Sequence, residues 1–200
     1  MAVVEKEIAS DATSVQFVDQ RYRLTTEQYY KMGEAGVFGD DDKRVELIDG
    51  EIIKLAPIAP SHGFHGQSLY DLLRSANPDW YVGHENPIRI IDGTEPLPDP
   101  YVAKGPRETY RHRHPNASDL LLVVEVSNSS LASDRKRKLG LYASSGIPEF
   151  WIVNLVDKQV EVYSVPAGET YSVTKIFKAG DNLPLSFATG KSLPVAEFVP

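Results

Sequence analysis

The order of hydrophobic and polar positions predicts alternating helices and strands from about residue 24 onward. Residues 44–55 contain two β-type runs on either side of Asp49-Gly50, which is the strongest short signal for a hairpin. Before this hairpin, Thr25 or Thr26 can cap a short helix, and after it the leucines that follow Ser61 recur at helical spacing. The pattern therefore predicts a helix, a hairpin and a second helix.

A continuous apolar run over residues 120–126 marks the centre of the predicted sheet. Such a run is typical of a strand that is covered on both faces. A helix that Ser133 or Asp134 would cap separates this run from a strand at 150–153, so the two strands form a β-α-β unit and should be parallel or nearly so. Alternating runs then follow as a meander, at 158–163 and 171–176.

The segments between these elements are less regular. Residues 80–91 predict one or two strands, and residues 97–102 predict another, with a proline on each side of Asp99. Because proline cannot donate a hydrogen bond within a sheet, this arrangement suits a strand end or an edge. The whole pattern predicts one α/β domain of mixed sheet over residues 23–200, preceded by an N-terminal arm at 1–22 without clear periodicity.

The composition is that of an ordinary globular domain. The chain has 200 residues, 42% of them hydrophobic and 24% charged, which is enough for a sizeable core. The absence of cysteine excludes disulfides, zinc fingers and cysteine nucleophiles, and no apolar run approaches the roughly 20 residues of a membrane span. With no evident signal peptide, we expect a soluble, cytoplasmic protein without membrane partners.

The charge balance argues against a protein that coats nucleic acid along its whole surface. The net charge is −7, whereas phosphate binding needs clustered lysine and arginine. Two local basic clusters remain, one at residues 107–114 and one at 135–138. Each could meet phosphates, or could simply form a solvated face.

Glu125 is an acidic residue near the end of the apolar run at 120–126. Burying an unpaired carboxylate destabilises a fold by several kcal/mol, so this side chain needs a partner. One interpretation is an ion pair with a lysine or arginine of the following helix. The other is a metal ligand, because Mg²⁺ prefers carboxylate and carbonyl oxygens, and the backbone carbonyl of Val126 lies one residue further on.

Asp99 is the best candidate for a second carboxylate, since it lies at the end of the preceding predicted strand. Taken alone, it could equally be a turn aspartate. Together, Asp99 and Glu125 could hold one Mg²⁺ or Mn²⁺ that positions a water molecule and neutralises charge on a scissile phosphate. A nearby lysine would complete such a site by stabilising the phosphate or orienting the water.

Several segments together resemble a known family. They are Pro98-Asp99, Glu125-Val126-Ser127, the stretch from Asp134 to Tyr142, the stretch from Gly146 to Val153, the stretch from Val45 to Glu51, and the helix start at His62. They resemble the Uma-two-type restriction endonucleases of the PD-(D/E)xK nuclease superfamily, over roughly residues 24–165. The resemblance implies a restriction-endonuclease-like mixed β-sheet core flanked by helices.

The resemblance also implies roles for individual residues. The superfamily pattern places a lysine two residues after the strand glutamate, but Ser127 stands there, and in this family the lysine function has moved to the following helix. Lys138 is the first candidate and Lys136 the reserve. Residues two apart on a helix diverge by about 200°, so only one of them can face the site, and Lys138 shares the face of Tyr142.

The remaining candidates are weighed against ordinary roles. Glu46 resembles the acidic residue that such folds supply to the metal or its surroundings from an early element, although a hairpin glutamate is otherwise usually exposed. His62 and His65 could reach a phosphate or a water molecule, or be ordinary surface histidines, and two histidines without a third ligand make a poor zinc site. Tyr142 and Trp151 are most simply core residues.

These observations lead to one principal hypothesis and two alternatives. The principal one is a Mg²⁺- or Mn²⁺-dependent endonuclease that hydrolyses DNA phosphodiester bonds, with Asp99, Glu125 and the Val126 carbonyl on the metal, Lys138 assisting and Glu46 in support. Cleavage of both strands needs two sites, so a homodimer is expected. The alternatives are a catalytically degenerate nuclease fold that binds DNA or a protein, and a phosphodiesterase acting on RNA or a small nucleotide.

Overall fold

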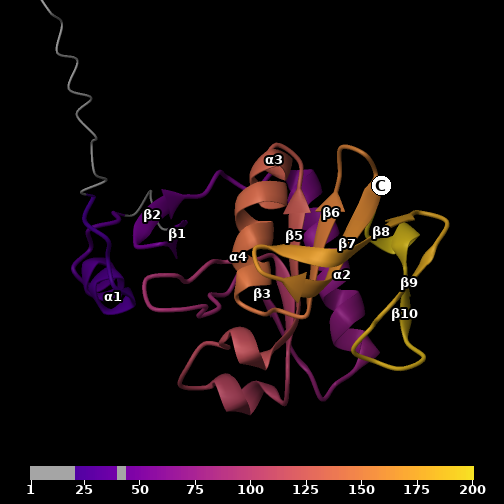
Figure 1. The fold of residues 1–200 in the computed structure, drawn as a ribbon, viewed down its shortest axis with the longest axis horizontal. Helices are drawn as coiled ribbons and strands as arrows, with labels where there is room; N and C mark the ends of the chain where they lie inside the picture. Colours follow the sequence, from indigo (N-terminus) through magenta and orange to yellow (C-terminus); the bar gives the residue numbers. More distant parts are fainter. Residues whose placement is uncertain (1–20, 40–43) are drawn as a thin grey trace, which may run out of the picture.

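A six-stranded mixed sheet forms the centre of the protein, which a computed structural model describes over residues 21–39 and 44–200 (Figure 1). The sheet order is β3-β4-β5-β6-β7-β8, and only β5 and β6 run parallel. The strands are β3 (Tyr81–His84), β4 (Pro100–Ala103), β5 (Leu120–Ser127), β6 (Glu149–Asn154), β7 (Gln159–Ala167) and β8 (Thr170–Lys178). Residues 1–20 of the predicted arm lie outside the described residues.

Two shorter pairs of strands accompany this sheet. The predicted hairpin is confirmed as β1 (Val45–Ile48) and β2 (Glu51–Lys54). Its turn has positive φ at both central residues, 52° and 70°, which is the conformation that Asp-Gly favours in a two-residue hairpin loop. Near the C-terminus, β9 (Asn182–Pro184) pairs with β10 (Ser192–Pro194).

Helices cover both faces of the sheet, as the apolar run at 120–126 predicted (Figure 1). On one face, Leu69 and Leu73 of α2 (Pro60–Ala76) pack with the even-numbered residues at the end of β5. On the other, α4 (Leu139–Ser144) places Tyr142 against Val123. Because successive strand residues alternate between faces, Glu125 lies on the side of α4.

The first helix, α1 (Thr26–Glu34), begins as the sequence predicted. Thr25 accepts a hydrogen bond from the backbone N–H of Gln28, whose side chain accepts one from the backbone N–H of Thr25. This capping box satisfies two donors that a helix start otherwise leaves unpaired.

The helix that follows β5 begins earlier than predicted. It starts at α3 (Leu131–Ser133), continues as a π-helical segment, Asp134–Lys138, and ends as α4. The prediction that Ser133 or Asp134 caps this helix is therefore wrong. The Asp134 carboxylate instead accepts a hydrogen bond from the Ser127 hydroxyl, 2.6 Å away, which ties the helix to the end of β5.

Two further strand predictions are confirmed. Residues 80–91 form one strand, β3, and the rest is irregular because its backbone pairs mostly with loops. The prolines beside Asp99 mark a strand end and not an edge, because Asp99 directly precedes β4 and β4 lies between β3 and β5. Pro100 is tolerated since it is the first residue of its strand. Within the described residues, no helix has both the length and the apolar character needed to cross a membrane.

Candidate active site

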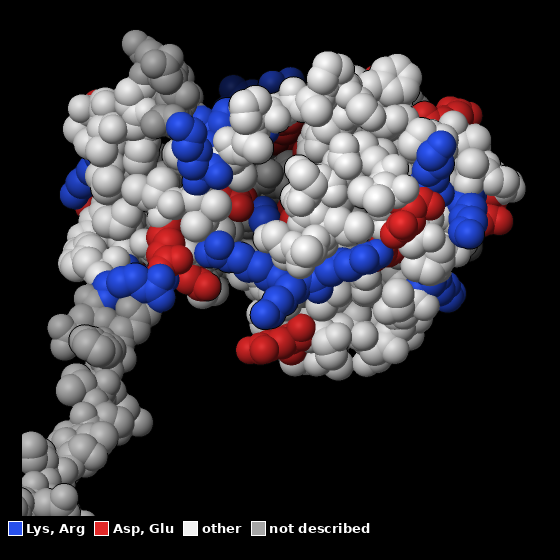
Figure 2. Space-filling view, turned by 90° about the horizontal axis from the view of Figure 1, so that it is seen from above, with Lys and Arg blue, Asp and Glu red and all other residues white. Residues whose placement is uncertain are grey.

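A cavity of about 310 Å³ collects the side chains that the sequence singled out. The residues that line it come from the hairpin, the start of α2, the start of β4, the end of β5 and the helix after β5. They include Glu46, His62, Asp99, Glu125, Val126, Asp134 and Lys138. In Figure 2, acidic and basic side chains lie together in a hollow of the upper face. Residues up to 92 positions apart in the sequence thus meet at one place.

Lys138 occupies the centre of this group. Its Nζ donates to Glu46 Oε2 at 2.7 Å and lies 3.4 Å from Glu125 Oε1. Burial lowers the pKa of Lys138, but the charges of Glu125 and Glu46 outweigh it and hold that pKa above its usual value. Lys136, by contrast, is exposed, so the structure brings Lys138 and not Lys136 to the site.

Glu125 is a buried carboxyl, with 8% of its surface exposed. Burial raises its pKa to about 8, although the neighbouring charge of Lys138 acts in the opposite direction. The Tyr142 hydroxyl donates to Glu125 Oε1 at 2.7 Å. Tyr142 is therefore a core residue that also contacts the site. Its position one helical turn after Lys138 is the feature of the sequence that could have indicated this contact.

Sheet register explains how Asp99 reaches Glu125. Tyr101 pairs with Val123 across the antiparallel β4–β5 ladder. Continued by two residues past the start of β4, this register brings Asp99 alongside Glu125, where opposed side chains are neighbours. The Asp99 charge is accordingly among those that raise the Glu125 pKa.

The backbone of Val126 also faces Asp99. Its N–H donates to Asp99 Oδ2 at 2.6 Å. In a strand, the N–H and C=O of one residue point to the same side, so the Val126 carbonyl is directed toward the Asp99 side of β5. The described structure thus brings together the ligand oxygens predicted from the sequence, which belong to two carboxylates and one backbone carbonyl.

His62 and Glu85 extend the site beyond Asp99. His62 Nε2 lies 2.8 Å from Asp99 Oδ1, and this hydrogen bond raises the His62 pKa above its usual value. Ligand atoms of His62, Glu85 and Asp99 all lie within 4.8 Å of one another, close enough to hold a metal ion. Sequence reasoning missed Glu85, because it follows β3 in a loop with a left-handed φ of 51° that no periodic pattern marks.

The two remaining groups of candidates lie differently. His65 does not line the cavity. Residues 111–114 of the basic cluster at 107–114 line a separate cavity of about 500 Å³ that includes none of the carboxylates above. The second cluster, at 135–138, borders the site: Lys138 lines the cavity, and the π-helical segment exposes Lys136 and Arg137 beside it. Two further cations, Arg44 and Lys54, also line the cavity. Figure 2 shows a band of Lys and Arg side chains beside the hollow.

Glu46 is buried, with 3% of its surface exposed, which excludes the interpretation of an exposed hairpin glutamate. Its Oε2 accepts hydrogen bonds from Lys138 and from the backbone N–H of Leu97, at 3.2 Å. The hydrogen bond to Lys138 places the Glu46 carboxylate next to the lysine ammonium group within the cavity.

Comparison with known proteins identifies similar sequences and folds. The sequence model of a family described as "Uma2: Putative restriction endonuclease" matches residues 26–196. Among solved structures, one match is to a protein titled as "a putative nuclease belonging to DUF820 from Anabaena variabilis ATCC 29413", with 15% identity and a TM-score of 0.65 over 88% of this chain and 97% of that one. At this identity the match shows a shared fold. No significantly similar sequence was found among curated proteins.

Proposed function

The chain belongs to the Uma2 family, whose description is "Putative restriction endonuclease", and we propose that it is a metal-dependent endonuclease that hydrolyses DNA phosphodiester bonds. The observation that carries this proposal is the single cavity lined by Glu46, Asp99, Glu125 and Lys138. Buried carboxylates are costly, and here they gather around one lysine at a place that solvent can enter. Such a concentration of perturbed groups favours a catalytic role over a structural one.

The proposed metal ligands are Asp99, Glu125 and the carbonyl of Val126. Oxygen donors of this kind fit Mg²⁺ or Mn²⁺. Tyr142 and Lys138 both contact Glu125 Oε1, and among the described residues no hydrogen bond uses Oε2, which leaves that oxygen for a cation. When bound, the ion would supply positive charge to the phosphate and lower the pKa of a coordinated water.

The protein's own groups have distinct tasks in this proposal. Tyr142 holds the Glu125 carboxylate in place, and Glu46 keeps Lys138 charged and directed into the cavity. From there the ammonium group can donate to a phosphate oxygen or orient the attacking water. The exposed cations beside the cavity would meet the phosphates of the strand, because they concentrate positive charge on a chain whose net charge is −7. A symmetric dimer would supply the second site for a second strand.

Incubation with supercoiled plasmid tests this function. With Mg²⁺ or Mn²⁺ the parent protein should convert the plasmid to nicked and linear forms, and chelation of the metal should stop the reaction. Asp99→Ala should lose nearly all of this activity, because the metal then lacks one carboxylate. DNA binding by the parent protein with no cleavage under either metal would instead favour the degenerate, binding-only alternative.

The position of the metal can be tested separately, because Asp99 belongs to two candidate groups. We expect calorimetric titration with Mn²⁺ to show a site that Asp99→Ala abolishes and Glu125→Gln weakens by at least about tenfold, since each removes a carboxylate ligand. Glu85→Gln is the matched variant on the side of His62. If Glu85→Gln abolishes Mn²⁺ binding and Glu125→Gln leaves it unchanged, the metal lies with His62 and Glu85 instead.

A further inference from the structure

The lysine of the proposed site comes from a helix, so its position depends on how that helix is fixed to the sheet. In the superfamily pattern the lysine is part of the strand itself, and no such dependence exists. Here the π-helical segment Asp134–Lys138 carries the lysine and also the residues that fix the helix to the sheet. Asp134 and Lys138 are buried toward the site, whereas Arg135 extends toward β7. A π-helical turn inside a helix is an irregular conformation that surrounding contacts must stabilise.

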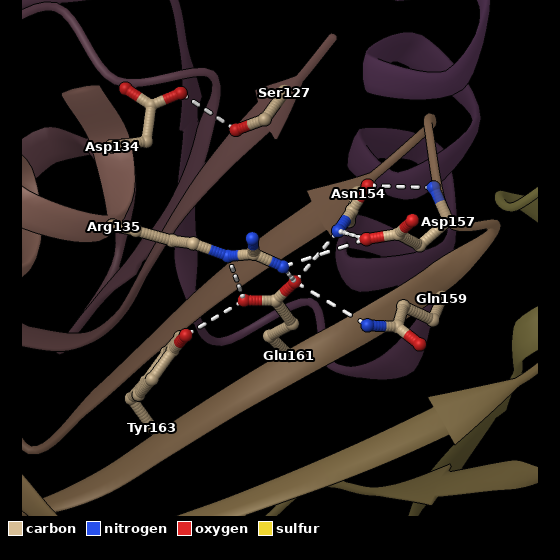
Figure 3. Close-up of polar contacts among 8 residues, drawn as sticks. All are labelled: Ser127, Asp134, Arg135, Asn154, Asp157, Gln159, Glu161 and Tyr163. Atoms are coloured by element: carbon tan, nitrogen blue, oxygen red, sulfur yellow. Dashed lines mark hydrogen bonds and ion pairs between the residues drawn. The ribbon is translucent and has the colours of Figure 1, made fainter. Parts of the chain in front are cut away.

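Arg135 ends in a cluster of polar groups around Glu161 of β7 (Figure 3). Its Nη2 donates to Glu161 Oε1 at 2.5 Å, and its Nε donates to Oε2 at 3.0 Å. Asn154 Nδ2 donates to Oε1 and the Tyr163 hydroxyl donates to Oε2, each at 2.7 Å. Both carboxylate oxygens of Glu161 are therefore used within the protein, which leaves no role for it as a metal ligand.

Glu161 is charged under all ordinary conditions. Only 2% of its surface is exposed, and burial alone would raise its pKa, but the hydrogen bonds from Arg135, Asn154 and Tyr163 lower that pKa to about 2. A buried carboxylate bound by the two parallel donors of an arginine has one well-defined geometry. The pair therefore holds the helix backbone at residue 135 in a fixed place over β7.

A second hydrogen bond fixes the adjacent residue, Asp134, to the sheet. The Ser127 hydroxyl, which stands where the superfamily pattern has its strand lysine, donates to Asp134 Oδ2 at 2.6 Å (Figure 3). Asp134 and Arg135 are thus fastened to β5 and to β7, on the two sides of β6. Lys138 follows within one turn of these anchors.

We propose that Glu161 is a positioning residue that, through Arg135, fixes the helical segment from which Lys138 reaches Glu46 and Glu125. Glu161 touches neither the cavity nor the proposed ligands, so it acts only through the helix. The expected effect of Glu161 on the cleavage rate rests on the proposed nuclease function, whereas its effect on the position of the helix does not.

The test compares Glu161→Gln in the parent protein and in the Lys138→Ala variant, using steady-state rates of plasmid cleavage over a range of plasmid concentrations. Displacement of a catalytic group by about 1 Å can cost a factor of about 100, so we expect Glu161→Gln to lower kcat by about 10- to 100-fold with KM within about twofold. In the Lys138→Ala variant it should cost no further activity, because the group that it positions is absent. Equal losses in both proteins would overturn the proposal.

Glu149→Gln is the matched control for simple destabilisation. Glu149 is similarly buried in the same sheet, but it accepts hydrogen bonds from Trp151 Nε1, at 2.6 Å, and from the Ser186 hydroxyl, and neither partner belongs to the helix. We expect Glu149→Gln to leave kcat unchanged, which separates the effect of Glu161→Gln from that of replacing any buried carboxylate in the sheet. If Glu161→Gln proves too unstable to assay, Tyr163→Phe removes one of the five hydrogen bonds to Glu161 and should give a smaller loss of the same kind.

Hydrogen exchange separates this inference from the function on which it rests. Glu161→Gln should speed exchange of the amides of residues 131–144 relative to the rest of the chain, and Glu149→Gln should not. Unchanged exchange in this segment would overturn the inference even if the enzyme is active. An inactive parent protein with faster exchange only in Glu161→Gln would refute the nuclease function and leave the anchoring role of Glu161 standing.

Discussion

Replacing Glu125 with glutamine is expected to reduce metal-dependent DNA cleavage by about a thousandfold or more while leaving the fold intact. Glutamine keeps the shape of the side chain and can still accept the hydrogen bond from Tyr142, but it removes the negative charge that would hold the cation. The measurement is the rate of plasmid nicking at saturating Mg²⁺, with circular dichroism and thermal melting on the same samples.

The difference in the free energy of unfolding between Glu125→Gln and the parent protein should depend on pH. Because burial raises the pKa of Glu125 to about 8 from a usual value of 4.5, the carboxyl contributes to stability when it is protonated, below pH 4.5, and loses that contribution as pH rises through 8. Glutamine does not ionise. Without metal, the variant should therefore gain stability relative to the parent between about pH 5 and pH 9, as measured by urea unfolding.

Glu149→Gln is again the suitable control, since it removes a buried carboxylate that does not line the cavity. It should retain cleavage at nearly the parent rate. Full activity of Glu125→Gln, with Mn²⁺ binding unchanged, would remove Glu125 from the metal site and direct attention to Glu85.

The sequence identified the catalytic candidates where a chemical anomaly stood out against a regular pattern. Glu125 interrupts an apolar run, so its burial and its need for partners follow from the sequence alone, and the folded chain confirms both. Helical periodicity separated Lys138 from Lys136, and the burial of the first and exposure of the second confirm that choice of face. The interpretation of Glu125 as the partner of a helix lysine is also confirmed, at 3.4 Å from Lys138, and is compatible with a metal-binding role.

Other residues were not predicted from the sequence because distant parts of the chain form their surroundings. Glu161 lies in an alternating strand, where a polar position ordinarily faces solvent, but Arg135 of another element covers it. Glu85 contacts Asp99 only because β3 and β4 are neighbours in the sheet. Period and spacing along one segment carry no information about what packs on it.

The start of the helix after β5 was misplaced for a related reason. Asp134 has the residue type of an N-cap, and local propensity favoured that role. In the folded chain its carboxylate is used by Ser127 instead, and the helix begins three residues earlier at Leu131. A tertiary hydrogen bond thus overrode a local preference in the helix that carries Lys138.

Lys138→Ala is expected to lower kcat by about 100- to 10,000-fold, the range over which a positioned proton-transfer or charge-stabilising group contributes, whereas Lys136→Ala should stay within about twofold. The two residues are two positions apart on one helix, yet only Lys138 contacts the buried carboxylates. Steady-state plasmid cleavage by both variants at equal protein concentration makes the comparison.

Loss of Lys138 should also have a structural effect that Lys136 cannot reproduce. Without its ammonium group, Glu46 and Glu125 are left buried side by side, and breaking a buried ion pair in this way typically costs about 3–5 kcal/mol unless a carboxyl takes up a proton. Because the bound metal would neutralise the same carboxylates, Mn²⁺ should raise the melting temperature of Lys138→Ala more than that of the parent protein. If Lys136→Ala shows the larger loss of rate and Lys138→Ala melts like the parent, the lysine of the site is Lys136 and the contacts of Lys138 are only structural.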